Sequence, residues 1–197
     1  MTPDTLKGLI LYEDDDIFVL NKPPGLLVHP VAADSIALTQ FLPFLGDGVA
    51  LAHRLDRETS GCLVLGRNPA MLKHLGHWFA SGQIKKTYHA LVQGQLEGSG
   101  VIDVALAKHN ALMQADAAGQ SALTHWTALE QRNGQTLVEL RPQTGRTHQL
   151  RAHMAHIGHP IMGDVKYGGP NAIRMMLHAS RIELPGYQAI LAPLPFN

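Results

Sequence analysis

The residues best suited to chemistry lie in one short polar stretch, residues 53–61, between two apolar runs. The stretch contains two arginines, two carboxylates, two hydroxyls and a glycine. The flanking runs, residues 49–52 and 62–65, have the length and composition of buried strands, so we expect a loop that is held at both ends. Its central carboxylate, Asp56, lies between Arg54 and Arg57, and nearby cations favour the ionised form of a carboxylate. The stretch therefore predicts a loop that presents Asp56 as a nucleophile at neutral pH.

A second polar stretch, residues 141–158, predicts a turn followed by a helix that stops at Gly158. Apolar residues in this helix recur with the spacing of a buried stripe. Arg151 leaves the helix beside that stripe, and a partly buried cation needs a carboxylate partner. The stripe consists of Leu150, Met154 and Ile157.

Histidines near the end of the same helix raise an alternative, a metal site with His153, His156, His159 and Asp164 as ligands. The two helical histidines are three residues apart, which differs from the His-Glu-x-x-His arrangement, and no Glu stands ready as a base. We therefore predict that these histidines pack structurally rather than bind a metal ion.

Four residues outside the two stretches also bear on a site. Lys22 and His29 flank a rigid Pro-Pro-Gly turn, where they could line a site or be an ordinary surface lysine and loop histidine. Tyr88 lies in a predicted strand, residues 85–92, and is the aromatic side chain to consider. Cys62 is the only cysteine, which excludes an internal disulfide, and we predict a small buried hydrophobe rather than a catalytic thiol.

The elements that position these residues are short strands and a few helices. The acidic turn at residues 13–16 is predicted as a solvated loop, and Asn133-Gly134 predicts a tight hairpin. Residues 93–120 carry weak periodicity and are assigned only one strand. The remaining predicted strands are 9–12, 17–20, 101–106, 122–130, 136–140, 175–179 and 188–191. The predicted helices are 36–45, capped by Ser35 and interrupted by Pro43, and a second from Pro69 to Gly82, capped by Asn68.

Composition indicates one soluble globular domain over residues 1–197, because 45% of the residues are hydrophobic and 16% are charged. The predicted strands, helices and hairpin indicate an α+β (mixed α/β) class with antiparallel hairpins. No signal peptide or membrane-spanning run is present, which predicts a cytoplasmic protein. The net charge is zero, yet residues 54–86 carry six basic and two acidic side chains and residues 141–181 carry six and one. These basic segments could form one positive face for nucleic acid, or be scattered solvated charge.

Taken together, the polar motifs resemble the RNA pseudouridine synthases of the RluA type over nearly the whole chain. Several motifs in the family's order are stronger evidence than any one alone. They are Asn21-Lys22-Pro23-Pro24-Gly25-Leu26 with Val28-His29-Pro30, His53-Arg54-Leu55-Asp56 with Thr59-Ser60-Gly61, Lys86-Thr87-Tyr88-His89-Ala90, Thr144-Gly145-Arg146-Thr147-His148-Gln149-Leu150-Arg151, Gly158-His159-Pro160-Ile161 with Gly163-Asp164 and Tyr167-Gly168, and Leu177-His178-Ala179.

The resemblance implies a catalytic domain built around a long, mainly antiparallel sheet with a central cleft, and no cofactor. It implies that Asp56 is the catalytic aspartate, Tyr88 the active-site tyrosine and Arg151 the basic partner of the aspartate. Arg54 matches the arginine that holds RNA open around a flipped uridine. Further substrate-binding residues implied by the motifs are His53, Lys22, His29, Arg146, His148, Leu177 and His178.

The expected partner is a structured RNA, a tRNA or rRNA stem-loop, bound by a monomer. The amino-terminal segment is too short for the separate RNA-binding domain of many relatives, so substrate choice is expected to come from the catalytic domain. Two alternatives stay open. A hydrolase of glycosidic bonds could use Asp56 with Glu58 as a carboxylate pair, a chemistry that needs roughly 5–9.5 Å between the carboxyls. A catalytically silent RNA-binding module is the other.

Overall fold

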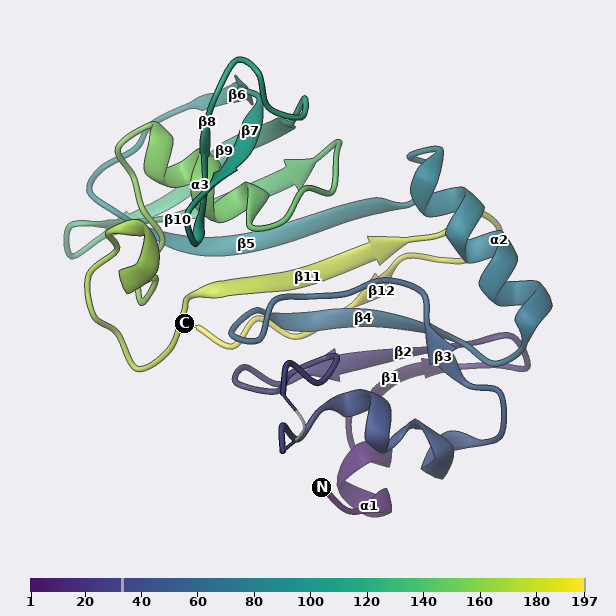
Figure 1. Cartoon of the computed structure of the whole chain (residues 1–197). Coiled ribbons are helices and arrows are strands. Elements are labelled where there is room, and N and C mark those ends of the chain that lie inside the picture. The colour runs from purple at the N-terminus through teal and green to yellow at the C-terminus, as the bar shows by residue number, and fades with distance from the viewer. Residues whose placement is uncertain (33, 197) are drawn as a thin grey trace. The chain divides into compact units, whose positions relative to one another are not determined.

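The computed structural model describes residues 1–32 and 34–196, which form two compact units (Figure 1). Unit 1 consists of Met1–Lys85 and Ala179–Pro193, and unit 2 consists of Lys86–His178 and the residues from Leu194 onward. Antiparallel strands dominate each unit and helices are few, which confirms the α+β class. The single domain over residues 1–197 stays a prediction, and each unit is described by itself.

Unit 1 is an antiparallel sheet in which β1 pairs with β2, β2 with β4, and the short β3 with β4. The β4 strand is apolar and fully buried, as predicted for the run after the polar loop, whereas the run before the loop forms the short β3, which is only partly buried. The elements of unit 1 are α1 (Pro3–Lys7), β1 (Ile10–Glu13), β2 (Ile17–Lys22), the 3-10 helices η1 (Leu38–Gln40) and η2 (Leu42–Leu45), β3 (Ala50–Leu51), β4 (Ser60–Gly66), α2 (Pro69–Ala80), most of β11 (Leu177–Glu183) and β12 (Ile190–Leu191).

The helix predicted over residues 36–45 is wrong in type, because the chain there forms the two short 3-10 helices. Pro43 lies at the start of η2, where its missing N–H and fixed φ prevent a longer α-helix from running through. Ser35 does not cap a helix; its hydroxyl accepts a hydrogen bond from the Ala32 N–H. By contrast, the Asn68 cap of α2 is confirmed, since its side-chain oxygen accepts the Met71 N–H at 2.8 Å.

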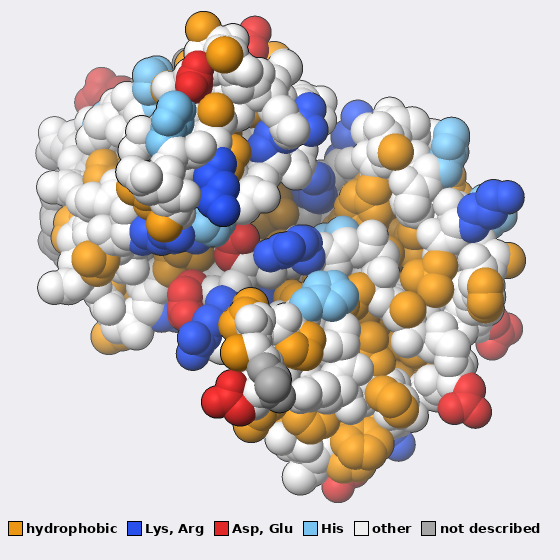
Figure 2. Space-filling view, viewed as in Figure 1, with side chains coloured by type: hydrophobic (Ala, Val, Ile, Leu, Met, Phe, Trp, Pro, Cys, Tyr) orange, Lys and Arg blue, Asp and Glu red, His pale blue; other side chains and the backbone are white. Residues whose placement is uncertain are grey.

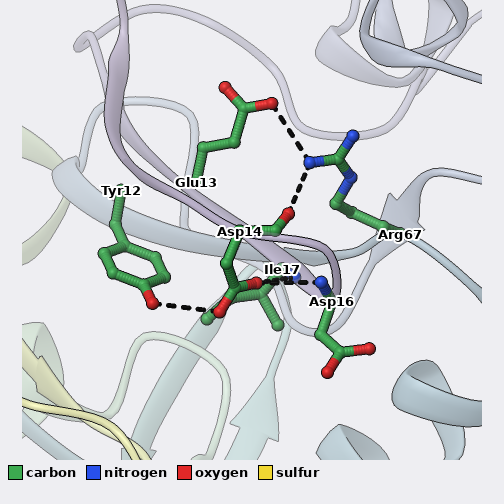
Figure 3. A network of polar contacts seen from close by, with 6 residues as sticks. All are labelled: Tyr12, Glu13, Asp14, Asp16, Ile17 and Arg67. Atoms are coloured by element: carbon green, nitrogen blue, oxygen red, sulfur yellow. Dashed lines mark hydrogen bonds and ion pairs between the residues drawn. The ribbon is translucent and has the colours of Figure 1, made fainter.

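The acidic turn between β1 and β2 is more ordered than a solvated loop (Figure 3). Asp14 Oδ1 accepts the backbone N–H groups of Asp16 and Ile17, and its Oδ2 accepts the Tyr12 hydroxyl. Arg67, just after β4, bonds to the Glu13 carboxylate and the Asp14 carbonyl. Burial acts to raise the pKa of Asp14, but the two backbone donors, with Tyr12 and Arg67, hold it below its usual value. The carboxylates of this turn therefore hold the hairpin in shape.

Unit 2 contains an antiparallel sheet with the strand order β5-β10-β9-β6 and a separate β7–β8 hairpin. The α3 helix packs against β8 and β10, and its Leu150 and Met154 lie in the core. Asn133 and Gly134 both have positive φ, which confirms the tight hairpin between β9 and β10. The elements are β5 (Lys85–Gln93), β6 (Ser99–Asp103), β7 (Leu106–His109), β8 (Leu112–Ala115), β9 (Leu123–Arg132), β10 (Gln135–Pro142), α3 (Gln149–His156) and the 3-10 helix η3 (Val165–Tyr167).

The strand predicted over residues 101–106 is wrong at its end. Strand β6 stops at Asp103, and Leu106 already belongs to β7. Leu106 is buried with Ala122 and Ala152 in a separate small core. It extended the apolar pattern of β6 in the sequence, but it belongs to β7 in the structure. Within the described residues, no helix is both long and apolar enough to span a membrane.

Candidate active site

The loop that carries Asp56 runs from the end of β3 to β4 in unit 1, and its first part is fixed by His53. Backbone pairing with β4 continues through the Ala52 N–H, which donates to the Val64 carbonyl at 3.1 Å. The His53 ring then takes over, because its Nε2 accepts the Val64 N–H at 3.0 Å. The ring also packs on Phe79 of α2, with centroids 4.7 Å apart. His53 thus anchors the residue next to Arg54, and the substrate contact predicted for it stays a prediction.

The far part of the loop is fixed by the Pro-Pro-Gly turn. Lys22 is 1% exposed, and its ammonium group donates to the carbonyls of Pro23, Leu26 and Arg57 at 2.9–3.0 Å. The Gly25 N–H donates to the same Arg57 carbonyl at 2.9 Å. Burial of this ammonium group does not favour the RNA contact predicted for Lys22. The structure instead gives Lys22 a part in holding the turn and the loop together.

Between these anchors, Leu55 points into the core with 6% exposure, while Arg54 is exposed and Asp56 is half-buried. The Thr59 N–H donates to the Asp56 carbonyl at 3.2 Å, which closes a tight turn. Side chains alternate along an extended chain, so Arg54 and Asp56 face away from the core when Leu55 between them is buried. The predicted loop with Asp56 at its centre is therefore confirmed as a structure.

The loop ends at Gly61, which has a φ of +104° in β4. A Cβ atom at this position would lie 2.2 Å from the Ala179 carbonyl oxygen of β11. Only glycine permits this approach, so β4 begins directly against the β11 backbone. Cys62 follows and is buried, as predicted; burial raises the pKa of its thiol to about 12.

In unit 2, Arg151 is held by Asp164. The Arg151 Nε donates to Asp164 Oδ2 at 2.6 Å and its Nη2 donates to Oδ1 at 2.8 Å, with the two side chains only 9% and 2% exposed. The guanidinium also lies 4.9 Å from the centre of the Tyr167 ring. The expectation that Arg151 needs a carboxylate partner is met within unit 2 by Asp164, while pairing with Asp56 stays a prediction.

The turn before α3 is shaped by Gln149 and His148. The Gln149 Oε1 accepts both the Thr144 hydroxyl and the Arg146 N–H, which folds residues 144–149 into a compact turn. His148 has a φ of +51°, a conformation that is uncommon for a residue other than glycine and often occurs at functional sites. Its Nδ1 lies 2.9 Å from the Tyr167 hydroxyl. Arg146 is exposed and donates from Nε to the Ser121 carbonyl.

The other predicted site residues differ in exposure. Tyr88 of β5 is partly buried and packs against the core of unit 2, whereas His29 is exposed. Leu177 is 3% exposed within that core and His178 is 1% exposed, so their placement does not favour the predicted substrate contacts. Those contacts stay predictions.

Three of the four residues of the metal alternative have protein partners, and the fourth, His156, is exposed. His153 is buried and its ring nitrogens contact the Thr124 hydroxyl and the Val104 carbonyl, while His159 contacts the Gln93 carbonyl. Asp164 binds Arg151. Over residues 1–32 and 34–196, no group of three His, Cys, Asp or Glu side chains is arranged to hold a metal ion.

Comparison with known proteins decides the family. The sequence profile of the family described as RNA pseudouridylate synthase matches residues 16–156. The chain belongs to the RNA pseudouridylate synthase family. This confirms the resemblance found from the motifs, and the members of this family are isomerases.

Relatives in bacteria cover most of the chain. An uncharacterized RNA pseudouridine synthase of Zymomonas mobilis is 42% identical over 94% of this chain and 93% of its own. A tRNA pseudouridine synthase C of Pectobacterium carotovorum is 38% identical over 89% of this chain and 54% of its own. A ribosomal large subunit pseudouridine synthase D of Haemophilus ducreyi is 36% identical over 85% and 54%. This chain therefore spans nearly all of the first pseudouridine synthase and about half of the other two.

Solved structures of the family are also similar. Human RNA pseudouridylate synthase domain containing 1 has a TM-score of 0.85 at 29% identity, over 95% of this chain and 84% of that one. Human RNA pseudouridylate synthase domain containing 4 has a TM-score of 0.85 at 28% identity, over 98% and 91%. These likenesses confirm the predicted pseudouridine synthase fold.

Sequence reasoning missed two residues beside Arg151. Asp164 was considered as a metal ligand and as part of a motif but not as the partner of Arg151, although a buried arginine needs a carboxylate. Tyr167 was seen only as part of a motif. Its hydroxyl accepts the Met113 N–H at 3.0 Å, a contact between distant parts of the chain that no local pattern signals.

Proposed function

We propose that the protein converts specific uridines in structured RNA to pseudouridine, with Asp56 as the nucleophile. The family supports uridine isomerisation in RNA. The observation that carries the role of Asp56 is its loop: the motif residues on both sides of it are the anchors, through His53 to Val64 and through Lys22 to the Arg57 carbonyl. A nucleophile benefits from such fixed placement because little order remains to be gained in the transition state.

The chemistry breaks the N1–C1′ bond of the uridine, turns the base, and joins C5 to C1′. The proton on C5 is lost and N1 gains one, so the product has the mass of the substrate. A carboxylate can act as the nucleophile in covalent catalysis of this kind, at the sugar or at the base. Tyr88 is proposed to stack on the base and to help remove the C5 proton, and Arg151 to orient the aspartate.

A uridine within a stem must leave the stack before it can react, at a cost of a few kcal/mol. We propose that phosphate contacts and the exposed Arg54 side chain offset this cost by holding the RNA open. The names of the relatives point to tRNA or ribosomal RNA, so a stem-loop of one of these is the proposed substrate. A monomer in the cytoplasm is the corresponding proposal for the protein itself.

The test is to map pseudouridine across total RNA from cells with the protein, without it, and with Asp56→Asn. We expect sites that vanish both without the protein and in the variant, which should fold normally because the exchange preserves side-chain size. Full modification by Asp56→Asn would contradict the assignment.

Glu58→Gln is the matched control. Glu58 is exposed and pairs with Arg57 at 3.4 Å, so we expect this variant to keep its activity. The hydrolase alternative predicts the opposite, with loss of activity in Glu58→Gln and release of free uracil by the wild type. RNA binding without any product would favour the silent binding module.

A further inference from the structure

Lys86 lies in β5, two residues before Tyr88, and the alternation of a strand puts the two side chains on the same face of the sheet. Tyr88 is paired with Leu140 across the β5–β10 ladder, and both pack on the core beneath α3. Lys86 thus extends from the α3 face of the sheet at the end of this core. Its neighbour Lys85 points to the opposite face.

The Lys86 ammonium group lies beside the turn that leads into α3. A Cβ atom on Gly145 would be 3.7 Å from Lys86 Nζ, so the amine is close to the Gly145 backbone. The next residue, Arg146, is exposed. The Lys86 amine therefore lies beside the turn at Gly145, and the residues after that turn include a second cation, Arg146, and then His148.

The carboxylate of the neighbouring β10 strand, Glu139, lies on the other face of the sheet and does not neutralise this cation. Glu139 is paired with His89, so it belongs to the face opposite Tyr88 and Lys86, and it forms an ion pair with Arg141. Within residues 1–32 and 34–196, Lys86 has no ion pair or hydrogen bond from its amine. Burial alone lowers the pKa of Lys86. A partly buried cation without a counter-charge is costly, and such groups normally bind an anion or a carboxylate.

We propose that Lys86 binds a phosphate oxygen of the RNA beside Tyr88. This inference rests on the proposed function, since it places a backbone phosphate next to the residue assigned to the base. The anion supplies the counter-charge that the protein omits at this position. A lysine is suited to the contact as a compact point charge.

Salt dependence of RNA binding tests the proposal, because each phosphate neutralised by a cation adds about 0.7 to the slope of log K against log salt for single strands. The parent protein is Asp56→Asn, which prevents turnover, and the probes are oligouridylate and bulk tRNA from cells that lack the protein. Into this parent we introduce Lys86→Met, Lys86→Arg and, as the matched control, Lys85→Met. Lys85 is exposed and donates to the Gly82 carbonyl, so it differs from Lys86 in face and partner but not in charge.

We expect Lys86→Met to weaken binding and to reduce the slope by about 0.7, Lys86→Arg to restore the slope, and Lys85→Met to retain it. The melting temperature of Lys86→Met should stay the same or rise, since an unpaired charge is removed; a purely structural lysine would lower it. An unchanged slope in Lys86→Met, or an equal loss of slope in Lys85→Met, overturns the proposal.

The phosphate contact and the proposed function can fail separately. If the wild type makes no pseudouridine but Lys86→Met still reduces the slope, the phosphate contact stands without the proposed function. If pseudouridine is made and the slope is unchanged, the function stands and the contact does not.

Discussion

The ion pair of Arg151 and Asp164 is buried, with the two side chains 9% and 2% exposed, and its energetics differ from those of pairs at the surface. Two charges are removed from water, and their hydrogen bonds in parallel compensate for that loss. Removal of one partner leaves a buried charge. A residue proposed to orient the nucleophile is thus held by a contact that cannot be weakened without a large cost.

We therefore predict that Asp164→Asn lowers the free energy of unfolding by about 3–5 kcal/mol, the usual cost of breaking a buried pair. Urea unfolding followed by circular dichroism measures it. The matched control is Glu183→Gln, which breaks an exposed pair with Arg181 at 3.0 Å and should cost about 1 kcal/mol or less. An equal loss in the free energy of unfolding for the two variants would show that the buried pair contributes no more to stability than the exposed pair.

The sequence patterns predicted the position of the candidate nucleophile better than they predicted the residues that hold its loop in place. The loop around Asp56 was predictable because apolar runs on both sides define where it begins and ends. The anchors of that loop were not, because His53 acts through a backbone N–H eleven residues away and Lys22 through a carbonyl thirty-five residues away. Both were expected to meet substrate because a polar side chain in a motif looks the same in either role.

At the scale of the elements, the β4 strand depends on one residue without a side chain. Gly61 combines a positive φ with a contact to the Ala179 backbone that leaves no room for a methyl group. We predict that Gly61→Ala lowers the free energy of unfolding by at least about 1–3 kcal/mol, because either β4 or β11 must shift. Activity should fall as well, since the Asp56 loop ends at this strand.

Gly76→Ala provides the control for that prediction. Gly76 lies in the α2 helix, is exposed, and has open space where its Cβ would be. The exchange should raise the free energy of unfolding by up to about 1 kcal/mol, since alanine is the better helix former. Thermal unfolding of both variants measures the two changes in stability. A destabilised Gly76→Ala variant, or a Gly61→Ala variant as stable as the wild type, would contradict the prediction.

The elements that sequence predicted well are those with local signals. Asn68 caps α2 and Asn133-Gly134 turns β9 into β10, each within a few residues. The two failures have different causes. Residues 36–45 are divided into two 3-10 helices because Pro43 does not allow a longer α-helix, which is a local effect. Leu106 is buried by residues far away in the sequence, Ala122 and Ala152, rather than by the strand that it seemed to prolong.

At the scale of the whole molecule, the net charge at pH 7 is zero with its 12 histidines neutral. Figure 2 shows Lys and Arg side chains on the viewed face of both units, with histidines among them. Attraction to RNA at neutral pH must therefore come from local groups of cations rather than from the molecule's total charge. Histidine is the side chain that changes this balance near neutral pH, since it takes up a proton as the pH falls through about 6.5.

We predict that binding of the Asp56→Asn protein to oligouridylate becomes roughly three- to tenfold tighter between about pH 7.5 and pH 6 at low salt. The sign follows from charge, because proton uptake by histidine side chains makes a protein more positive as the pH falls, while RNA phosphates stay anionic. His89 and His153 should contribute less than a histidine at the surface, because burial lowers the pKa of each. Fluorescence anisotropy at both pH values measures the effect, and salt at about 1 M should abolish it by screening. Binding that weakens on acidification, or a gain that survives high salt, would mean that a specific titrating contact and not the overall charge governs the affinity for RNA.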